Sequence, residues 1–168
     1  MTACGDDPPN KEIQQAQQAI DTARAAEANR YATDEFTGAT DALKHAQAAI
    51  VARDYRQALN DAIDARDRAQ TAAKDGAEKK AAAKIEVDRA LHDTALMIID
   101  ARAQLRTAET TRRPARVVAP IRRGIAEAET HVQEARTAFE RGDYQNAGLS
   151  LAKSMLLLNE QKLRLLAR

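Results

Sequence analysis

The longest regular pattern in this chain of 168 residues runs from Asp54 to Thr110 and reads DYRQALNDAIDARDRAQTAAKDGAEKKAAAKIEVDRALHDTALMIIDARAQLRTAET. Apolar residues recur in it at the spacing that places them on one face of an α-helix. A single glycine, Gly76, interrupts the pattern, and one glycine costs a helix about 1 kcal/mol, which alanine-rich neighbours can offset. We therefore predict one long helix over about residues 54–110, which measures about 85 Å if it is continuous.

Alanine dominates the composition of the whole chain. There are 38 alanines but only 29 Leu, Ile, Val and Phe residues together, and tryptophan is absent. Because alanine favours helices and is disfavoured in strands, this composition excludes a β-sandwich and an α/β enzyme with a thick core. Disordered chains are also poor in large apolar residues, but they carry a high net charge, whereas 26 basic and 25 acidic residues leave +1 here. The composition therefore predicts an all-α protein.

The helical spacing continues on both sides of the long segment. Two further helices are predicted before it and two after it, so that five helices are expected in all. A break at Pro114 separates the long helix from the fourth, and a turn at Arg141-Gly142-Asp143 separates the fourth from the fifth. An Asp-Tyr pair, Asp54-Tyr55, recurs as Asp143-Tyr144. We expect the aspartate to cap the new helix and the tyrosine to pack back across the hairpin in both places.

This repeat predicts an elongated all-α protein of two antiparallel three-helix bundles that share the long central helix. The expected parts are a flexible tether over residues 1–10, a first bundle over 11–75, a helical connector over 76–83 and a second bundle over 84–168. The connector contains no side chain larger than alanine that favours burial, so it either stays bare or bends at Gly76 and lets the bundles dock. Alanine faces remove little area from water, at about 25 cal/mol per Å², which favours the extended arrangement.

The beginning of the chain has the pattern of a lipid-attachment site. Cys4 is the only cysteine, so no internal disulfide can form, and Thr2-Ala3-Cys4 matches the last three positions of a lipobox. The polar stretch from Asp6 to Asn10 is typical of the tether that follows such a cysteine, whereas Met1 stands where a lipobox has leucine. We predict that Cys4 carries lipid and anchors the protein to a membrane; the alternative is an ordinary cysteine near the N-terminus.

These features, together with YATDEF at residues 31–36 and the turn Arg53-Asp54-Tyr55, resemble the alanine-rich helical domain of unknown function of proteobacterial envelope lipoproteins, which is sometimes fused to an OmpA-like domain. The resemblance is best over residues 1 to about 75, and it departs from the usual Tyr-Ala-Pro of that family at Thr33. It implies a periplasmic location, anchored at the outer membrane, and no known catalytic residues. The sequence contains no OmpA-like segment, so the resemblance does not extend to peptidoglycan binding.

Patterns for catalysis or metal binding are missing from the sequence. His45, His92 and His131 fall on three different predicted helices, and none is preceded at three residues by the glutamate that helix-bundle di-iron sites require. Nucleophile motifs and glycine-rich phosphate loops are also missing. We therefore expect no enzymatic activity, no cofactor and no metal.

Arginine is concentrated around the break near Pro114. Seven arginines and one acidic residue, Glu109, lie between residues 102 and 123. Because the guanidinium group binds phosphate or carboxylate through two hydrogen bonds, we single out five candidates for contact with an anion. These candidates are Arg112, Arg113, Arg116, Arg122 and Arg123. The alternative is a solvated loop whose arginines offset helix dipoles, and nucleic acid is not an expected partner because no aromatic residue lies among them.

The predicted function is that of a non-catalytic, lipid-anchored periplasmic spacer or adaptor that contacts an envelope protein or an acidic polymer, as a monomer or weak dimer. One alternative is a soluble helical carrier that binds an apolar ligand or cargo along the last helix, whose apolar face is widened by Leu149, Leu156, Leu163 and Leu166. Another is a cytosolic coiled-coil scaffold, which requires a heptad seam left exposed for a second chain.

Overall fold

The computed structural model describes the backbone of residues 7–166 and the side chains of residues 7–164. All regular structure in this range is α-helical, which confirms the all-α prediction. The elements are α1 (Asn10–Ala25), α2 (Ala28–Tyr31), α3 (Thr33–Val51), α4 (Tyr55–Thr110), α5 (Ala115–Glu140) and α6 (Tyr144–Leu166). The predicted lipid-attachment residue, Cys4, lies outside the described residues.

The described chain has six helices rather than the five predicted, because the first predicted helix is broken. Helix α1 ends at Ala25, and Glu27 adopts a left-handed backbone conformation with φ of 57° before the single turn of α2. Ala28 and Ala32 on the far side of this break are buried in a small cluster with Ala72 of α4. No glycine or proline marks the break in the sequence, so helix propensity alone could not predict it.

The α3–α4 and α5–α6 turns have the same backbone geometry. Arg53 has φ of 60° and Gly142 has φ of 76°, so in each turn one residue in the left-handed conformation follows the end of a helix. The amides of Arg53 and Gly142 both bond a carbonyl three residues earlier, at 2.9 Å. This is the usual way to satisfy the last carbonyls of a helix, and glycine is the residue that adopts it with least strain.

The aspartate that follows each of these turns caps the next helix, as predicted. Asp54 Oδ1 accepts a hydrogen bond from the amide three residues later at 3.0 Å, and Asp143 Oδ1 does the same at 3.4 Å. Tyr144 packs back on the preceding helix, with its ring centroid 5.3 Å from that of Phe139. The repeated Asp-Tyr pair therefore has a structural role in the α5–α6 turn, and its aspartate has the same role in both turns.

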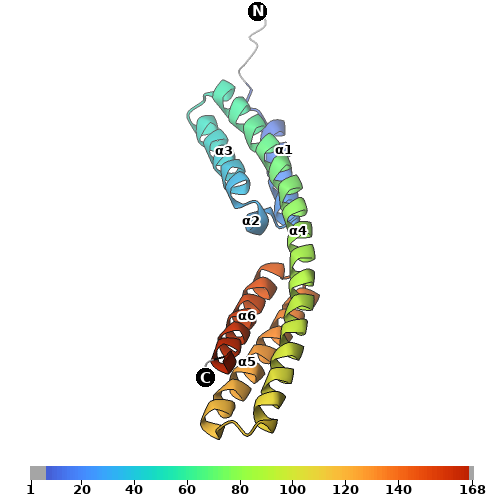
Figure 1. Cartoon of the computed structure of the whole chain (residues 1–168). Coiled ribbons are helices and arrows are strands. Elements are labelled where there is room, and N and C mark those ends of the chain that lie inside the picture. The colour runs from blue at the N-terminus through green and yellow to red at the C-terminus, as the bar shows by residue number, and fades with distance from the viewer. Residues whose placement is uncertain (1–6, 167–168) are drawn as a thin grey trace, which may run out of the picture. The chain divides into compact units, whose positions relative to one another are not determined.

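The chain divides into two compact units, Met1–Ala81 and Ala82–Arg168, and α4 contributes to both of them (Figure 1). The division falls inside the segment 76–83 that we expected to connect two bundles. Helix α4 is not interrupted at Gly76, which is buried against the backbone of Ala28. Residues 76–81 are therefore part of the first unit, because the absence of a side chain at Gly76 allows α2 to lie directly on α4.

The first unit buries alanine where most helical proteins bury larger side chains. Ile20 of α1 and Leu43 of α3 pack on Ala65 and Ala69 of α4. Apart from Gly76, the α4 residues of this unit that are buried are all alanines: Ala58, Ala62, Ala65, Ala69 and Ala72. Since the distance between helix axes depends on the side chains at the contact, an alanine face lets α1 and α3 approach α4 closely.

The second unit has a core of larger residues contributed by α4, α5 and α6. Its two clusters contain Leu105, Ile121, Ile125 and Leu158, and Val87, Val132 and Leu151. The buried Ser154 hydroxyl donates a hydrogen bond to the Ala128 carbonyl at 2.8 Å, which satisfies this polar group of α6 where it packs against α5.

Three leucines that we expected to widen the apolar face of the last helix are exposed instead. Leu149, Leu156 and Leu163 have 61%, 72% and 68% of their surface exposed. Each lies two residues, or about 200° around the helix, from a buried position such as Leu151 or Leu158. Helix α6 therefore has apolar side chains on two opposite sides, and only one of these sides faces the core.

Candidate functional site: the arginine hairpin

The arginine hairpin comprises residues 102–123, which form the end of α4, the turn 111–114 and the beginning of α5. Arg112 has φ of 52°, and the amides of Arg112 and Arg113 bond the carbonyls of Glu109 and Ala108, both at 3.1 Å. Pro114 then stands immediately before α5, where its fixed φ and missing amide hydrogen are tolerated. The turn thus closes α4 and starts α5 within four residues.

Buried side chains hold the two arms of this hairpin together. Leu105 and Ala108 of α4 pack with Val118 and Ile121 of α5 in one apolar cluster. Because these residues alternate with the arginines along both helices, burial of the apolar side chains directs the charged side chains to the surface.

Two ion pairs join the outer sides of α4 and α5. Arg102 Nε lies 2.6 Å from Glu129 Oε1, and Arg122 Nη2 lies 2.6 Å from Glu109 Oε1. The hydrogen bond and charge of the Glu129 carboxylate raise the pKa of Arg102. Of the five predicted anion-contact residues, Arg122 is therefore engaged by the protein's own Glu109. Arg113 is half-buried and also takes part in an interaction within the protein.

The remaining three candidates, Arg112, Arg116 and Arg123, are exposed, and no carboxylate of the described residues forms an ion pair with them. Arg116 and Arg123 are two turns apart on one side of α5, about 10 Å along its axis. The first turn of α5 contains no acidic residue, and no side chain caps it. The positive end of this helix dipole lies beside Arg112 and Arg116, and Arg123 adds a further cation along α5, so this part of the hairpin suits an anion.

Residues 11–87 match the family model of a Domain of unknown function (DUF4398). No curated protein and no solved structure matched the chain. The match to DUF4398 runs from α1 through α3 and along α4 as far as Val87. It supports the part of the predicted resemblance that concerns a helical domain of unknown function.

The arginine hairpin lies outside the segment that matches DUF4398, since the hairpin begins at Arg102. Its chemistry therefore has to be inferred from its own residues. The three histidines lie apart from it: His45 and His92 are exposed, and His131 Nδ1 is 2.8 Å from Glu134 Oε2. Within residues 7–164 we find no group of three or more His, Cys, Asp or Glu side chains placed to hold a metal ion.

One surface depression beside α6 is small, and two wider ones, one in each unit, are lined mainly by polar side chains. A cleft between α4 and α6, lined by Met97, Ala101 and Leu158 among others, has a volume of about 50 Å³. Sites for small molecules usually measure about 300–1,000 Å³. A wider groove of about 580 Å³ in the first unit is lined mainly by glutamine, threonine and alanine side chains, with Arg66 as its charged residue. In the part of the chain that the structure describes, no helix is both long and apolar enough to span a membrane.

Both ion pairs of the hairpin were missed from the sequence because their partners lie 27 and 13 residues apart. They nevertheless obey one rule, since α4 and α5 run antiparallel from the same turn. The residue numbers of both pairs, Arg102 with Glu129 and Arg122 with Glu109, add to 231. Once one pair fixes the register of the hairpin, the other follows from the sequence.

Proposed function

We propose that this protein is a non-catalytic, lipid-anchored helical adaptor at the periplasmic face of the outer membrane, and that the arginine hairpin contacts anionic groups of an envelope partner. The observation that carries the proposal is the exposure of Arg112, Arg116 and Arg123 beside the uncapped beginning of α5, without carboxylate partners among the described residues. The location is supported by Thr2-Ala3-Cys4 and by the resemblance to envelope lipoproteins.

Phosphate groups are the partners that this surface favours most. A guanidinium group makes two parallel hydrogen bonds to a phosphate, and an arginine near an anionic lipid surface contributes about 1 kcal/mol at moderate salt. Lipid headgroups, lipopolysaccharide and acidic cell-wall polymers all carry such anions. Since exposed charges are screened beyond about 10 Å at 0.1 M salt, the contact is expected to weaken as the salt concentration rises.

Replacement of Arg112, Arg116 and Arg123 by serine is expected to weaken retention on anionic vesicles about tenfold at 0.1 M salt, because three exposed cations are removed from the hairpin. Cosedimentation with vesicles of phosphatidylglycerol and phosphatidylethanolamine measures this effect, and isolated sacculi test the cell-wall polymer in the same way. The protein carries Cys4→Ser in these experiments, so that a lipid anchor does not hold it on the vesicle.

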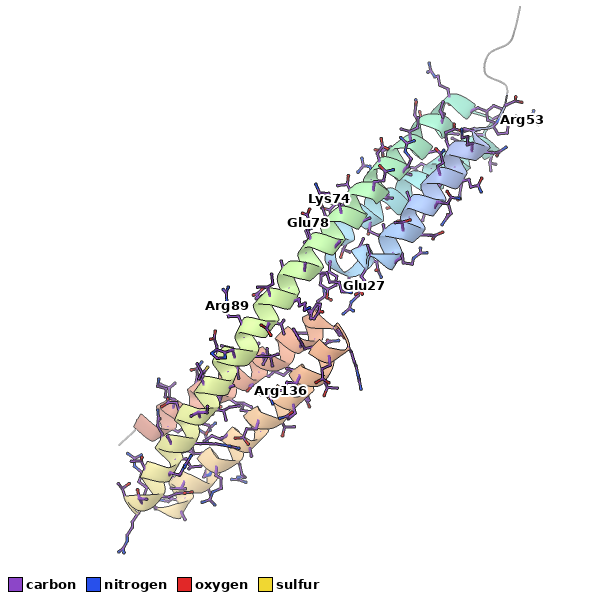
Figure 2. The ribbon with its side chains drawn as sticks, turned by 90° about the vertical axis from the view of Figure 1, so that its right-hand side faces the viewer. Glu27, Arg53, Lys74, Glu78, Arg89 and Arg136 are labelled. Carbon is purple, nitrogen blue, oxygen red and sulfur yellow. The ribbon has the colours of Figure 1, made fainter. Side chains whose placement is uncertain are left out.

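A matched control removes the same charge elsewhere. Arg53, Arg89 and Arg136 are also exposed, and they come from the α3–α4 turn, from α4 and from α5 outside the hairpin (Figure 2). Their replacement by serine is expected to leave retention within about twofold of the unmodified protein. Equal losses for the two triple variants would show that net charge, and not the hairpin, governs binding.

Cys4 is expected to carry a diacylglycerol thioether and an acylated amine when the gene is expressed with its own upstream codons in a bacterial host. Mass spectrometry of the purified protein then shows the added mass, and Cys4→Ser removes it. An unmodified Cys4 in the wild-type protein would contradict the anchor, although it would leave the hairpin experiment valid.

The soluble-carrier alternative has less support. The exposed leucines of α6 stand on the outer side of a helix. The cleft between α4 and α6 has a volume of only about 50 Å³, and the wider groove of about 520 Å³ beside the α5–α6 turn is lined mainly by polar side chains. An apolar ligand needs a concave site that removes most of its surface from water. The exposed face of α6 is better suited to another helix.

A further inference from the structure

The outer stripe of α6 has the pattern of a coiled-coil seam. We define this stripe by five exposed residues: Leu149, Ala152, Leu156, Asn159 and Leu163. The leucines repeat every seven residues, and Ala152 and Asn159 each follow a leucine by three, which is the a/d spacing of helices that pair. With 61–72% of their surface exposed, the leucines take no part in the core of their own unit.

We propose that the outer stripe binds the outer stripe of a second copy of this chain, with the two α6 helices antiparallel. The charges beside the stripe are the reason for this choice of partner. Lys153 and Glu160 are exposed, lie seven residues apart and flank the stripe on the same side, at e positions. In an antiparallel pair e positions face e positions, so Lys153 meets Glu160 of the second copy and Glu160 meets Lys153 of the second copy.

This charge pattern also selects one register. In it Leu156 lies beside Asn159 of the second copy, and Leu163 lies beside Ala152 of the second copy. A shift by one heptad in one direction places Lys153 opposite Lys153 of the second copy, and a shift in the other direction places Glu160 opposite Glu160 of the second copy. Like charges directly opposite each other are destabilising. A parallel pair would place Lys153 next to Gly148 of the second copy and Glu160 next to Met155 of the second copy, and neither of these residues carries an opposite charge.

Glu160 already bonds Arg164 of its own chain at 2.6 Å. Both side chains of that pair are about half exposed, at 49% for Glu160 and 50% for Arg164. Exposed pairs of this kind contribute little, so the pair does not prevent Glu160 from meeting Lys153 of the second copy. The polar Asn159 in the seam lowers stability while favouring one register, so we expect a weak dimer with twofold symmetry.

A second exposed apolar stripe in the same unit shows why exposure alone does not select this partner. Ile85, Leu96 and Ile99 lie on the outer side of α4, with 64%, 52% and 63% of their surface exposed. Three positions that repeat every seven residues beside this stripe are acidic: Glu86, Asp93 and Asp100. Two such helices in the antiparallel arrangement would bring these carboxylates together, so the α4 stripe disfavours antiparallel pairing with itself.

Sedimentation equilibrium of the full chain under reducing conditions tests the proposal, because the reductant prevents a disulfide through Cys4. The unmodified protein is expected to show a reversible monomer–dimer equilibrium. Leu156→Gln with Leu163→Gln is expected to raise the dissociation constant at least about a hundredfold, since four leucines leave the dimer interface. The matched control, Leu96→Gln with Ile99→Gln on α4, is expected to keep the dimer.

Charge reversal tests the antiparallel arrangement itself. Lys153→Glu and Glu160→Lys are each expected to raise the dissociation constant about tenfold, because each creates two like-charge contacts. The variant that carries both changes exchanges the two charges, restores two opposite pairs and is expected to return to the unmodified value. Circular dichroism melting of every variant checks that it is folded. Because the substituted positions are exposed, the melting temperature is expected to change little.

Three outcomes would overturn the proposal. One is the finding that the unmodified protein stays monomeric up to about 1 mM. Another is a dimer that the α6 substitutions leave intact or that the α4 substitutions dissolve. The third is failure of the double charge exchange to restore what the single reversals weaken. None of these outcomes bears on the arginine hairpin, so its test stands separately.

Discussion

Replacement of Ile121 by alanine is expected to lower the free energy of unfolding of the unit Ala82–Arg168 by about 2–5 kcal/mol. Ile121 has no exposed surface, and it packs with Leu105, Ile125 and Leu158, so that all three helices of the unit contribute to its environment. Alanine removes buried carbon atoms and leaves a cavity that helices held by short turns cannot fill. Urea unfolding followed by circular dichroism measures the loss.

Ile99→Ala is the matched control for this prediction. Ile99 lies in the same unit on the exposed side of α4, and 63% of its surface is in contact with solvent. The substitution is expected to change the free energy of unfolding by less than about 0.5 kcal/mol. Similar losses at Ile121 and Ile99 would mean that the cluster around Leu105 and Leu158 is not the core of the unit. Hydrogen exchange resolved by segment shows whether α5 and α6 lose protection with Ile121→Ala.

Gly76→Ala is expected to destabilise the unit Met1–Ala81 by about 1–2 kcal/mol, although alanine normally stabilises a helix interior. A Cβ at this position would lie 2.9 Å from the Ala28 Cα and 3.2 Å from the Ala28 nitrogen. Those atoms belong to the backbone of α2, and Lys80 of α4 forms an ion pair with Glu27 just before it. The backbone of α2 therefore has to move away from α4.

Gly38→Ala is expected to have the opposite sign and to raise stability by about 0.5–1 kcal/mol. Gly38 also lies inside a helix, but a Cβ there would meet the end of the Arg68 side chain, 3.2 Å from Nη1, which can turn aside. Thermal melting of the two variants compares the same substitution at two sites. Stabilisation by both would show that α2 does not lie directly on α4 at Gly76.

Much of the helical structure was predictable because it depends on neighbours in the chain. Alanine content and apolar spacing predict the helices, and the aspartates at Asp54 and Asp143 predict where two of them begin. The break at Glu27 was not predictable in this way. Nothing in the local sequence opposes a continuous helix there, and the left-handed residue is compensated by burial of Ala28 and Ala32 against α4.

The candidate site was predictable as a concentration of arginine but not as a set of free cations. The sequence places Arg122 and Arg123 side by side, yet among the side chains that the structure describes only Arg122 of the two meets a carboxylate, that of Glu109 across the hairpin. The exposed leucines of α6 were also visible in the sequence only as a pattern, without their exposure. Their seven-residue spacing is plain in the sequence, whereas the side of the helix that faces the core depends on where α4 and α5 lie.

Sequence alone is sufficient for the all-α class, for the long helix through Gly76 and for the turns at Asp54 and Asp143, since backbone propensity and capping act within a few residues. Three features depend on residues distant in the chain: the close contact of Gly76 with Ala28, the division of the arginines into paired and unpaired, and the exposure of Leu149, Leu156 and Leu163. A helix with apolar residues on two sides does not encode which side is buried. Packing against neighbouring helices decides that, because each helix can turn only one side toward a shared core.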